Sequence, residues 1–223
     1  MRIAFLTNEF VIEKPDGGGL GNYIHRMSRA LQDLGHEVEV FVPRTRAETA
    51  PRTEWGGVLV HHVPLPQGRI LNLVRRVDRR WLRSPWGGVA NYLATGLGLG
   101  RSLATRHAQM PFDLVQSTNC GTAGLFVRRC SQRVHLARMS SVRELTFAVD
   151  GQAAFPGARV MSWMEWIAVR RAHAIYAPSQ FTADYLRPRR NQPIAVVRPP
   201  MYLEVDPDEG GLDALLPARY LLH

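Results

Sequence analysis

The opening of the chain restricts its fold more than any other feature, because two apolar segments flank a glycine cluster and an amphipathic helix. Residues Arg2–Asn8 are predicted to form a buried strand, since the apolar run there is bounded by polar residues. Apolar residues after the glycines repeat at helical spacing, and Gly35 is predicted to cap that helix. Val38–Val42 is predicted as a second strand, which Pro43 ends. A helical crossover of this length joins parallel strands, so the opening predicts a β–α–β unit.

The same alternation of short apolar strands and helices continues through the chain. Further strands are expected at Val58–Val63, Phe112–Ser117, Val134–Met139, Ala174–Ala177 and Ile194–Val197. Further helices are expected at Thr122–Arg129, Met161–Arg171 and Gln180–Leu186. This order predicts an α/β fold with a doubly wound, mostly parallel, Rossmann-like sheet.

Composition agrees with a folded, soluble α/β chain. Of the 223 residues, 45% are hydrophobic and 21% are charged, which excludes intrinsic disorder and allows one large domain or two small ones. No apolar run approaches the roughly 18 residues that span a bilayer, and we expect no signal peptide. The two cysteines, Cys120 and Cys130, make no disulfide framework, so we expect a cytoplasmic protein. The net charge of +9 comes almost entirely from arginine and favours polyanionic partners.

The amino-acid composition of the sequence changes near its end. From Pro199 onward, prolines, glycines and acidic residues alternate as they do in linkers, and Asp206 and Asp208 are expected to be solvated there. Arg219 then begins a new apolar pattern. We therefore expect a domain over residues 1–198, a linker over residues 199–218, and the start of a truncated second domain over residues 219–223.

The glycine cluster Gly17–Gly21 precedes a helix, which suits an anion site. Glycine lets backbone N–H groups approach a phosphate, and a helix N-terminus adds partial positive charge; the alternative is a plain flexible turn. The Walker A pattern is absent because no Gly-Lys-Ser/Thr follows. The dinucleotide fingerprint fails at Ile24, and residues Glu9–Asp16 separate the glycines from their strand, which argues against NAD binding.

Two stretches around this loop, Pro15–Ile24 and Leu31–Val40, resemble the opening of the retaining nucleotide-sugar glycosyltransferases of the GT-B fold, the family called glycosyl transferase group 1 or family 4. Later segments resemble the same family in the same order, at Phe112–Ser117, Ala172–Thr182 and Val196–Met201. The resemblance runs from the first residue to the last, with variable stretches between.

The resemblance implies two Rossmann-like domains that face each other across a cleft. The N-terminal domain of such enzymes mostly holds the acceptor, and the C-terminal domain holds the sugar nucleotide. This chain is similar to the N-terminal domain. The resemblance therefore implies a glycan-biosynthesis enzyme that moves sugar from a nucleotide-sugar donor to a hydroxyl acceptor. We expect the fragment alone to be inactive, and we expect no cofactor and no metal.

The resemblance also implies site residues. In the glycine loop, backbone N–H groups are expected to bind a phosphate of donor or acceptor, and these residues are Gly18, Gly19, Leu20 and Gly21. Asp16 is a candidate catalytic residue that orients an acceptor hydroxyl; alternatively, it only forms a turn. Ser140 stands where many relatives have a cleft histidine and is the second catalytic candidate.

Three more residues are candidates for binding in the cleft. Arg138 and Arg143 flank Ser140 and are expected to hold an anionic acceptor group; alternatively, both are solvated surface arginines. Asn119 follows a strand that leads into the cleft and is a further binding candidate.

The stretch Arg69–Arg83 is basic and amphipathic. Its apolar residues at helical spacing are Ile70, Leu73, Val74, Val77, Trp81 and Leu82, and its other arginines are Arg75, Arg76, Arg79 and Arg80. Such a segment can lie on anionic lipid at the inner face of a membrane. The alternative is a surface helix that packs on its own domain.

Other features carry structural interpretations. His61 and His62 are adjacent on an expected strand, so they point to opposite faces and are predicted to be structural. The cysteines lack metal-ligand spacing. Trp163, Trp166 and Ile167 form a helical stripe that is predicted to lie in the core.

Two other functions compete with sugar transfer. The charge and the arginine stretch also fit a non-catalytic basic domain that binds nucleic acid or anionic membrane. No recognisable nucleic-acid motif is present, so we expect no specific nucleic-acid partner. An NADP-dependent oxidoreductase rests only on Arg44 and is weakened by the failed dinucleotide fingerprint.

Overall fold

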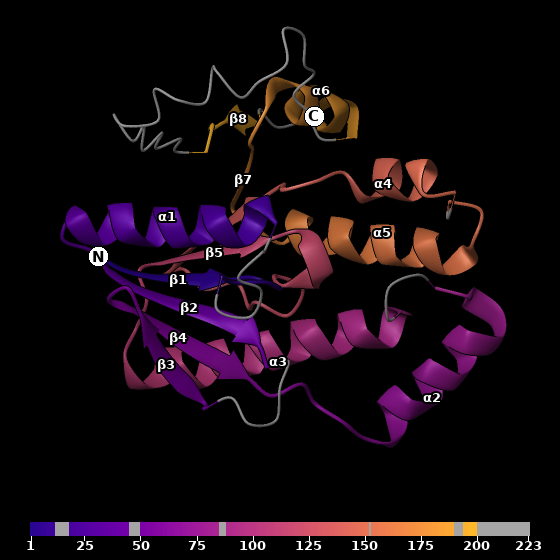
Figure 1. Ribbon diagram of the computed structural model, residues 1–223, viewed down its shortest axis with the longest axis horizontal. Coiled ribbons are helices and arrows are strands. Elements are labelled where there is room, and N and C mark those ends of the chain that lie inside the picture. The colour runs from indigo at the N-terminus through magenta and orange to yellow at the C-terminus, as the bar shows by residue number, and fades with distance from the viewer. Residues whose placement is uncertain (12–17, 45–49, 85–87, 152, 190–193, 200–223) are drawn as a thin grey trace, which may run out of the picture.

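The computed structural model describes residues 1–11, 18–44, 50–84, 88–151, 153–189 and 194–199. Its centre is an eight-stranded sheet with the order β3-β4-β2-β1-β5-β6-β7-β8 (Figure 1). The strands are β1 Arg2–Leu6, β2 Glu37–Pro43, β3 Arg52–Trp55, β4 Val58–Val63, β5 Leu114–Thr118, β6 Val134–Arg138, β7 Ala174–Ala177 and β8 Ala195–Val196. Neighbouring strands run parallel except β3, which is antiparallel to β4. The predicted doubly wound, mostly parallel sheet is confirmed.

Helices cover both faces of this sheet, with α1 over one face and α3 over the other (Figure 1). The helices are α1 Gly19–Asp33, α2 Arg69–Val77, α3 Gly88–Gln109, α4 Arg143–Val149, α5 Pro156–Arg170 and α6 Gln180–Leu186. Short helical turns lie at Asp78–Leu82, Cys120–Thr122 and Arg187–Arg189. Among the described residues, no helix is both long and apolar enough to cross a bilayer.

The core has one layer on each side of the sheet, because alternate residues of a strand point to opposite faces. In β1, Ile3 and Phe5 pack in a buried cluster with Ile24 of α1. Ala4 and Leu6 pack in a separate buried cluster with Leu99 of α3 and neighbouring strands. The central strand β1 is therefore buried on both sides, as the continuous apolar run near the N-terminus predicts.

The predicted end of the first helix is confirmed. α1 stops at Asp33, and Gly35 has a φ of 80°, in the left-handed region that favours glycine. β2 begins two residues later, at Glu37, so the turn between helix and strand is short.

The predicted helix over Thr122–Arg129 is wrong. Only a single 3₁₀ turn, Cys120–Thr122, follows β5 there. Gly121 has a φ of 64° and Thr122 a φ of 60°. Two successive left-handed residues cannot continue a right-handed helix, so the chain turns sharply at this point.

Three elements were not predicted, namely β3, α3 and α4. Helix α3 is difficult to predict from its sequence because Gly96, Gly98 and Gly100 each lower helix propensity. Their absence of side chains allows close packing instead. A Cβ atom on Gly100 would lie 3.0 Å from both Cβ and the carbonyl oxygen of Phe126.

The two adjacent histidines are structural, as predicted. The His61 ring stacks on Phe41 with centroids 4.4 Å apart, and its Nε2 lies 2.6 Å from Glu39. His62 points to the other face, where Nε2 lies 2.8 Å from the Thr53 hydroxyl. Arg106 of α3 also bonds both oxygens of Glu39 at 2.9 Å.

Several predicted features lie outside the described residues. They are Asp16, Gly17, the linker beyond Pro199 with its two aspartates, and the apolar pattern over residues 219–223. The proposed division into domains is therefore not tested by the structure.

Candidate functional site

A cleft of about 750 Å³ lies at the carboxyl ends of the parallel strands. It surrounds the junction of β1 and β5, where the chain leaves β1 toward one edge of the sheet and later returns to the other. Open α/β sheets bind ligands at such a switch point. The lining residues are Asn8, Glu9, Leu20, Pro43, Arg44, Leu65, Asn91, Tyr92, Thr95, Cys120, Gly121, Ser140, Ser141 and Arg143. Polar groups predominate among them, so the cleft suits a hydroxyl-rich or charged ligand.

The glycine loop reaches this cleft at the N-terminus of α1. Leu20 lines the cleft, and the Gly21 N–H donates a hydrogen bond of 3.2 Å to the Glu9 carboxylate. No acceptor for the N–H groups of Gly19 or Leu20 is found in the described part of the chain. At the edge of the cleft, the Leu20 N–H therefore has no acceptor among the described residues, and the Gly21 N–H is already bonded to Glu9.

Asn119 joins the ends of β5 and β6 at the floor of the cleft. Its side-chain oxygen accepts a 2.7 Å hydrogen bond from the Ser140 N–H, and its amide donates one of 2.9 Å to the Ser141 carbonyl. Asn119 is 1% exposed, so it holds the site from beneath and does not line it. A ligand in the cleft would meet Ser140 and Ser141 first.

Arg138 is buried behind Ser140. Its guanidinium donates a 2.6 Å hydrogen bond to the Ser140 hydroxyl and lies 3.8 Å above the Tyr23 ring. Because the Ser140 oxygen accepts this bond, its own hydrogen is available to donate into the cleft. Arg138 is only 5% exposed and pairs with no carboxylate among the described residues, so it is not a solvated surface arginine.

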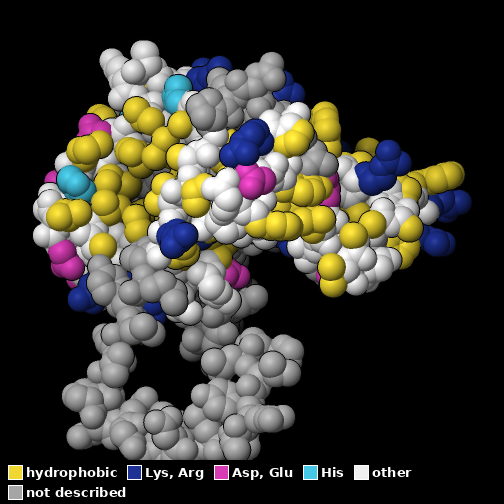
Figure 2. All heavy atoms as spheres, turned by 90° about the horizontal axis from the view of Figure 1, so that it is seen from above, with side chains coloured by type: hydrophobic (Ala, Val, Ile, Leu, Met, Phe, Trp, Pro, Cys, Tyr) yellow, Lys and Arg dark blue, Asp and Glu magenta, His cyan; other side chains and the backbone are white. Residues whose placement is uncertain are grey.

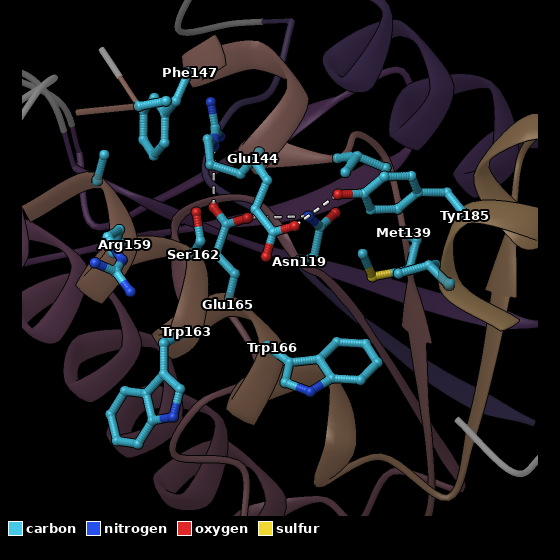
Figure 3. A pocket seen from close by; sticks show the side chains of 15 residues that line it. Asn119, Met139, Glu144, Phe147, Arg159, Ser162, Trp163, Glu165, Trp166 and Tyr185 are labelled. Carbon is cyan, nitrogen blue, oxygen red and sulfur yellow. Dashed lines mark hydrogen bonds and ion pairs between the residues drawn. The ribbon is translucent and has the colours of Figure 1, made fainter. Parts of the chain in front are cut away.

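Glu165 of α5 is the central charged residue of the site, and it was not predicted from the sequence. It is 3% exposed and accepts hydrogen bonds from Tyr92 at 3.0 Å, the Gly121 N–H at 3.2 Å and Arg143 at 3.3 Å. Its fourth donor is the Asn119 amide at 3.1 Å (Figure 3). Burial raises the pKa of Glu165, against the lowering effects of Arg143 and of the hydrogen bonds. Arg143 thus lines the cleft and forms an ion pair with Glu165, so it is not a solvated surface arginine.

Glu165 also affects the groups around it. Burial, then the nearby Glu165 charge, raises the pKa of the Cys120 thiol to about 11. This thiol therefore stays protonated near neutral pH and is a poor nucleophile. Burial and Glu165 likewise raise the pKa of the Tyr92 phenol. Within the described residues, no three His, Cys, Asp or Glu side chains gather as metal ligands.

A second cavity of about 410 Å³ adjoins the cleft between α4, α5 and α6 (Figure 3). Trp163 and Trp166 line it from α5, and Phe147 lines it from α4. Trp163 is 62% exposed, so the prediction that the tryptophan stripe lies in the core is wrong for this residue. Arg143 lines both this cavity and the cleft, and its partner Glu165 lines this cavity.

One signal in the sequence pointed to Glu165. It is the only acidic residue of the helix Pro156–Arg170, which is otherwise mainly apolar and basic. A lone carboxylate on a buried helix face needs partners, because an unpaired buried charge is costly. Those partners lie on α3, on α4 and in the turn after β5, so local spacing could not identify them.

Comparison with known proteins decides the family. Residues 18–200 match the family model described as "Glycosyl transferase 4-like domain". The chain belongs to the glycosyl transferase 4-like family. It is 30% identical over 213 residues to the D-inositol 3-phosphate glycosyltransferase of Nocardiopsis dassonvillei, an alignment that covers 90% of this chain and 45% of that protein. The chain therefore spans less than half the length of this curated relative.

The glycosyl transferase 4-like domain also resembles solved GT-B structures. Sucrose-phosphate synthase from Thermosynechococcus elongatus matches with a TM-score of 0.58 at 14% identity, over 89% of this chain and 47% of that one. UGT2 of Phytolacca americana, complexed with UDP-2fluoro-glucose and pterostilbene, matches with a TM-score of 0.51 at 12% identity, over 91% and 55%. At these identities the likeness concerns the fold. The family match does not favour the alternative of a non-catalytic basic domain.

Proposed function

We propose that this chain is the acceptor-side half of a glycosyltransferase that moves sugar from a nucleotide-sugar donor to a hydroxyl. The observation that carries the proposal is the polar cleft at the switch point of the sheet, within a chain of the glycosyl transferase 4-like family. Retention of configuration is proposed from the family resemblance alone. Residues 1–198 form the acceptor domain in this proposal, and residues 199–218 link it to a donor domain.

The acceptor that we propose is a phosphorylated polyol. The relative from Nocardiopsis dassonvillei is named for D-inositol 3-phosphate, and its alignment covers most of this chain. The cleft offers matching groups, since Ser140 can donate its hydroxyl hydrogen and the guanidinium of Arg143, which pairs with Glu165, lines the cleft. Arg138 supports this anion site from behind, because it fixes the Ser140 oxygen and contributes an uncompensated charge.

The chemistry that we propose depends on closure of the two domains around the reacting groups. The Gly19 and Leu20 amides, at the N-terminus of α1, are proposed to stabilise phosphate charge that develops on the leaving nucleotide. Asp16 is proposed to orient the acceptor hydroxyl. The donor domain supplies the remaining charged groups, and neither a metal nor an organic cofactor takes part.

We also propose that α2 and the turn after it attach the protein to the inner face of an anionic membrane. Ile70, Leu73, Val77 and Trp81 are all more than 40% exposed, and only Leu71 of α2 is buried. Figure 2 shows hydrophobic and basic side chains adjoining at the right-hand end of the molecule, the end at which Figure 1 places α2. This outward arrangement supports lipid contact over simple packing on the domain.

The activity is tested on the full natural chain by measuring sugar transfer to D-inositol 3-phosphate. Ser140→Ala removes a donor to the anion, so we expect kcat/KM to fall at least about tenfold. Ser131→Ala, on an exposed turn at the opposite end of the sheet, is the matched control and should leave kcat/KM unchanged. Equal rates for the two variants would contradict the proposed acceptor site.

A further inference from the structure

A basic pocket lies at the end of the sheet opposite the cleft. Its volume is about 490 Å³, and its lining comes from the C-terminal half of α3 and from the segment before β6. Asn91 and Thr95, near the start of α3, line the cleft, whereas Arg101 and His107, farther along the same helix, line the basic pocket. The two sites therefore do not share residues.

Arg133 is the buried charge of this pocket. Arg133 is only 6% exposed, and its Nη2 donates a 2.8 Å hydrogen bond to the Arg128 carbonyl. Its Nε is buried and meets no acceptor in the described part of the chain. A buried guanidinium without a carboxylate is costly, so an anionic ligand would relieve an existing penalty.

The surroundings of Arg133 are also positive. Arg101, Arg128 and Arg129 line the same pocket, and none of its lining residues is acidic. The sequence contains no aspartate or glutamate between Asp113 and Glu144. Arg129 is partly engaged by the carbonyls at the end of α5, with hydrogen bonds of 3.1 and 3.4 Å, which leaves its charge unneutralised. Four arginines thus line the pocket, and no acidic residue of the lining neutralises them.

The rest of the pocket is mostly apolar. Leu97, Leu103, Ala104, Ala108 and Phe126 form most of its walls, and His107 and Cys130 complete them. Its volume lies in the range that small ligands occupy and is too small for a folded partner. The pocket therefore combines an anion-binding end with walls that favour an apolar body.

We propose that this pocket binds a small organic phosphate, with the phosphate against Arg133 and the apolar body against Phe126 and the α3 wall. The site is separate from the cleft, so the proposal does not depend on sugar transfer. Multiple guanidinium donors suit a phosphate, which can accept several charge-assisted hydrogen bonds at once.

Phenyl phosphate is a suitable probe because it carries both a phosphate and an apolar ring. Cys130 lines the pocket and is partly exposed, so its alkylation rate with N-ethylmaleimide reports on occupancy. Cys120 is buried and should not interfere. We expect phenyl phosphate to slow Cys130 alkylation in a saturable way, and inorganic phosphate to do so with weaker affinity. Absence of saturable protection by either compound would overturn the proposal.

Arg133→Met keeps an unbranched apolar stem and removes the guanidinium group with its charge. We expect it to weaken phenyl phosphate binding at least about tenfold, which corresponds to roughly 1.4 kcal/mol. Arg26→Gln, on the exposed face of α1, is the charge-matched control and should not change protection. Unchanged protection in Arg133→Met would refute the site. If Arg133→Met fails to fold, the exposed pair Arg101→Gln with Arg128→Gln replaces it, with a several-fold loss expected and no loss refuting the site.

Discussion

The Glu165 carboxylate is almost fully buried and yet satisfies four donors from three different parts of the chain. It fixes the sharp turn after β5 through the Gly121 N–H and fixes Arg143 at the cleft wall. Thr122, next in this turn, is a β-branched residue with a φ of 60°, a conformation that needs support from its surroundings. Glu165 is accordingly a positioning residue for the cleft.

Glu165→Gln should destabilise the protein because it removes the buried negative charge and leaves Arg143 uncompensated. We expect the free energy of unfolding to fall by about 3 kcal/mol. Urea denaturation measures this loss. Glu144→Gln is the control, because the Glu144 bond to Tyr185 is exposed, and it should cost less than about 1 kcal/mol. Similar losses for both variants would show that the Glu165 network does not hold the fold.

Glu39 gives the protein a defined acid sensitivity. Burial would raise the pKa of this carboxyl, but hydrogen bonds from His61 and Arg106 and their charges outweigh burial and lower the pKa to about 2. A lowered pKa means that the carboxylate stabilises the fold above its unfolded pKa near 4.5, and that this stabilisation, about 3 kcal/mol, disappears as the pH falls toward 2. A carbon-detected NMR titration of the Glu39 carboxyl should give the low pKa. An ordinary value near 4.5 would contradict the ion-pair cluster.

At the residue scale, prediction from the sequence succeeded where the role of a residue depends only on its neighbours in the chain. The helix cap at Gly35 and the opposed histidines follow from neighbouring residues alone. Glu165 and the burial of Arg138 depend on partners from distant segments, such as Tyr23 and Asn119. Those contacts exist only after the sheet has formed, so spacing in the sequence does not reveal them.

Helix α3 illustrates an element whose local sequence conflicts with its packing. Its glycines reduce helix propensity, which is why the helix was not predicted, yet they let it approach Phe126 closely. The predicted helix over Thr122–Arg129 failed for the converse reason, since two left-handed residues interrupt an apparently regular stretch. Strand positions were easier to predict because each is a short apolar run between polar residues.

Gly100→Ala tests this close packing. Alanine normally stabilises a helix by about 1 kcal/mol relative to glycine, but the new Cβ would lie 3.0 Å from two atoms of Phe126. We therefore expect a net loss of about 1–3 kcal/mol in unfolding free energy. Gly19→Ala in α1 is the control, because its Cβ would meet no atom within 4 Å, and it should not destabilise the protein. Stabilisation by Gly100→Ala would contradict the contact.

The membrane proposal is tested at α2. Replacing five arginines of α2 and the residues after it by glutamine should abolish flotation of the protein with anionic liposomes; the five are Arg75, Arg76, Arg79, Arg80 and Arg83. High salt should likewise abolish flotation of the unsubstituted protein, because the attraction between the arginines and the anionic lipid is electrostatic. Trp81→Ala should weaken flotation as well, since the exposed ring contributes apolar contact. Unchanged flotation of the glutamine variant would exclude α2 as the membrane contact.

At the scale of the whole molecule, the two ends of the sheet carry different surfaces. The carboxyl ends of the strands form the polar cleft, and the opposite end carries the basic pocket around Arg133. Alternation of strands and helices in the sequence predicted a doubly wound, mostly parallel sheet, whereas a cleft was expected only from the family resemblance. It did not predict the basic pocket, whose arginines come from α3 and from the segment before β6.

Ligand titration of the purified chain tests the central claim that this domain holds the acceptor. Arg133→Met serves as the background, so that the basic pocket does not contribute to binding. We expect saturable binding of D-inositol 3-phosphate, weakened at least about tenfold by Ser140→Ala, and only very weak binding of a nucleotide-sugar. Submicromolar binding of the nucleotide-sugar, or D-inositol 3-phosphate binding that Ser140→Ala leaves unchanged, would contradict the assignment of the cleft to the acceptor.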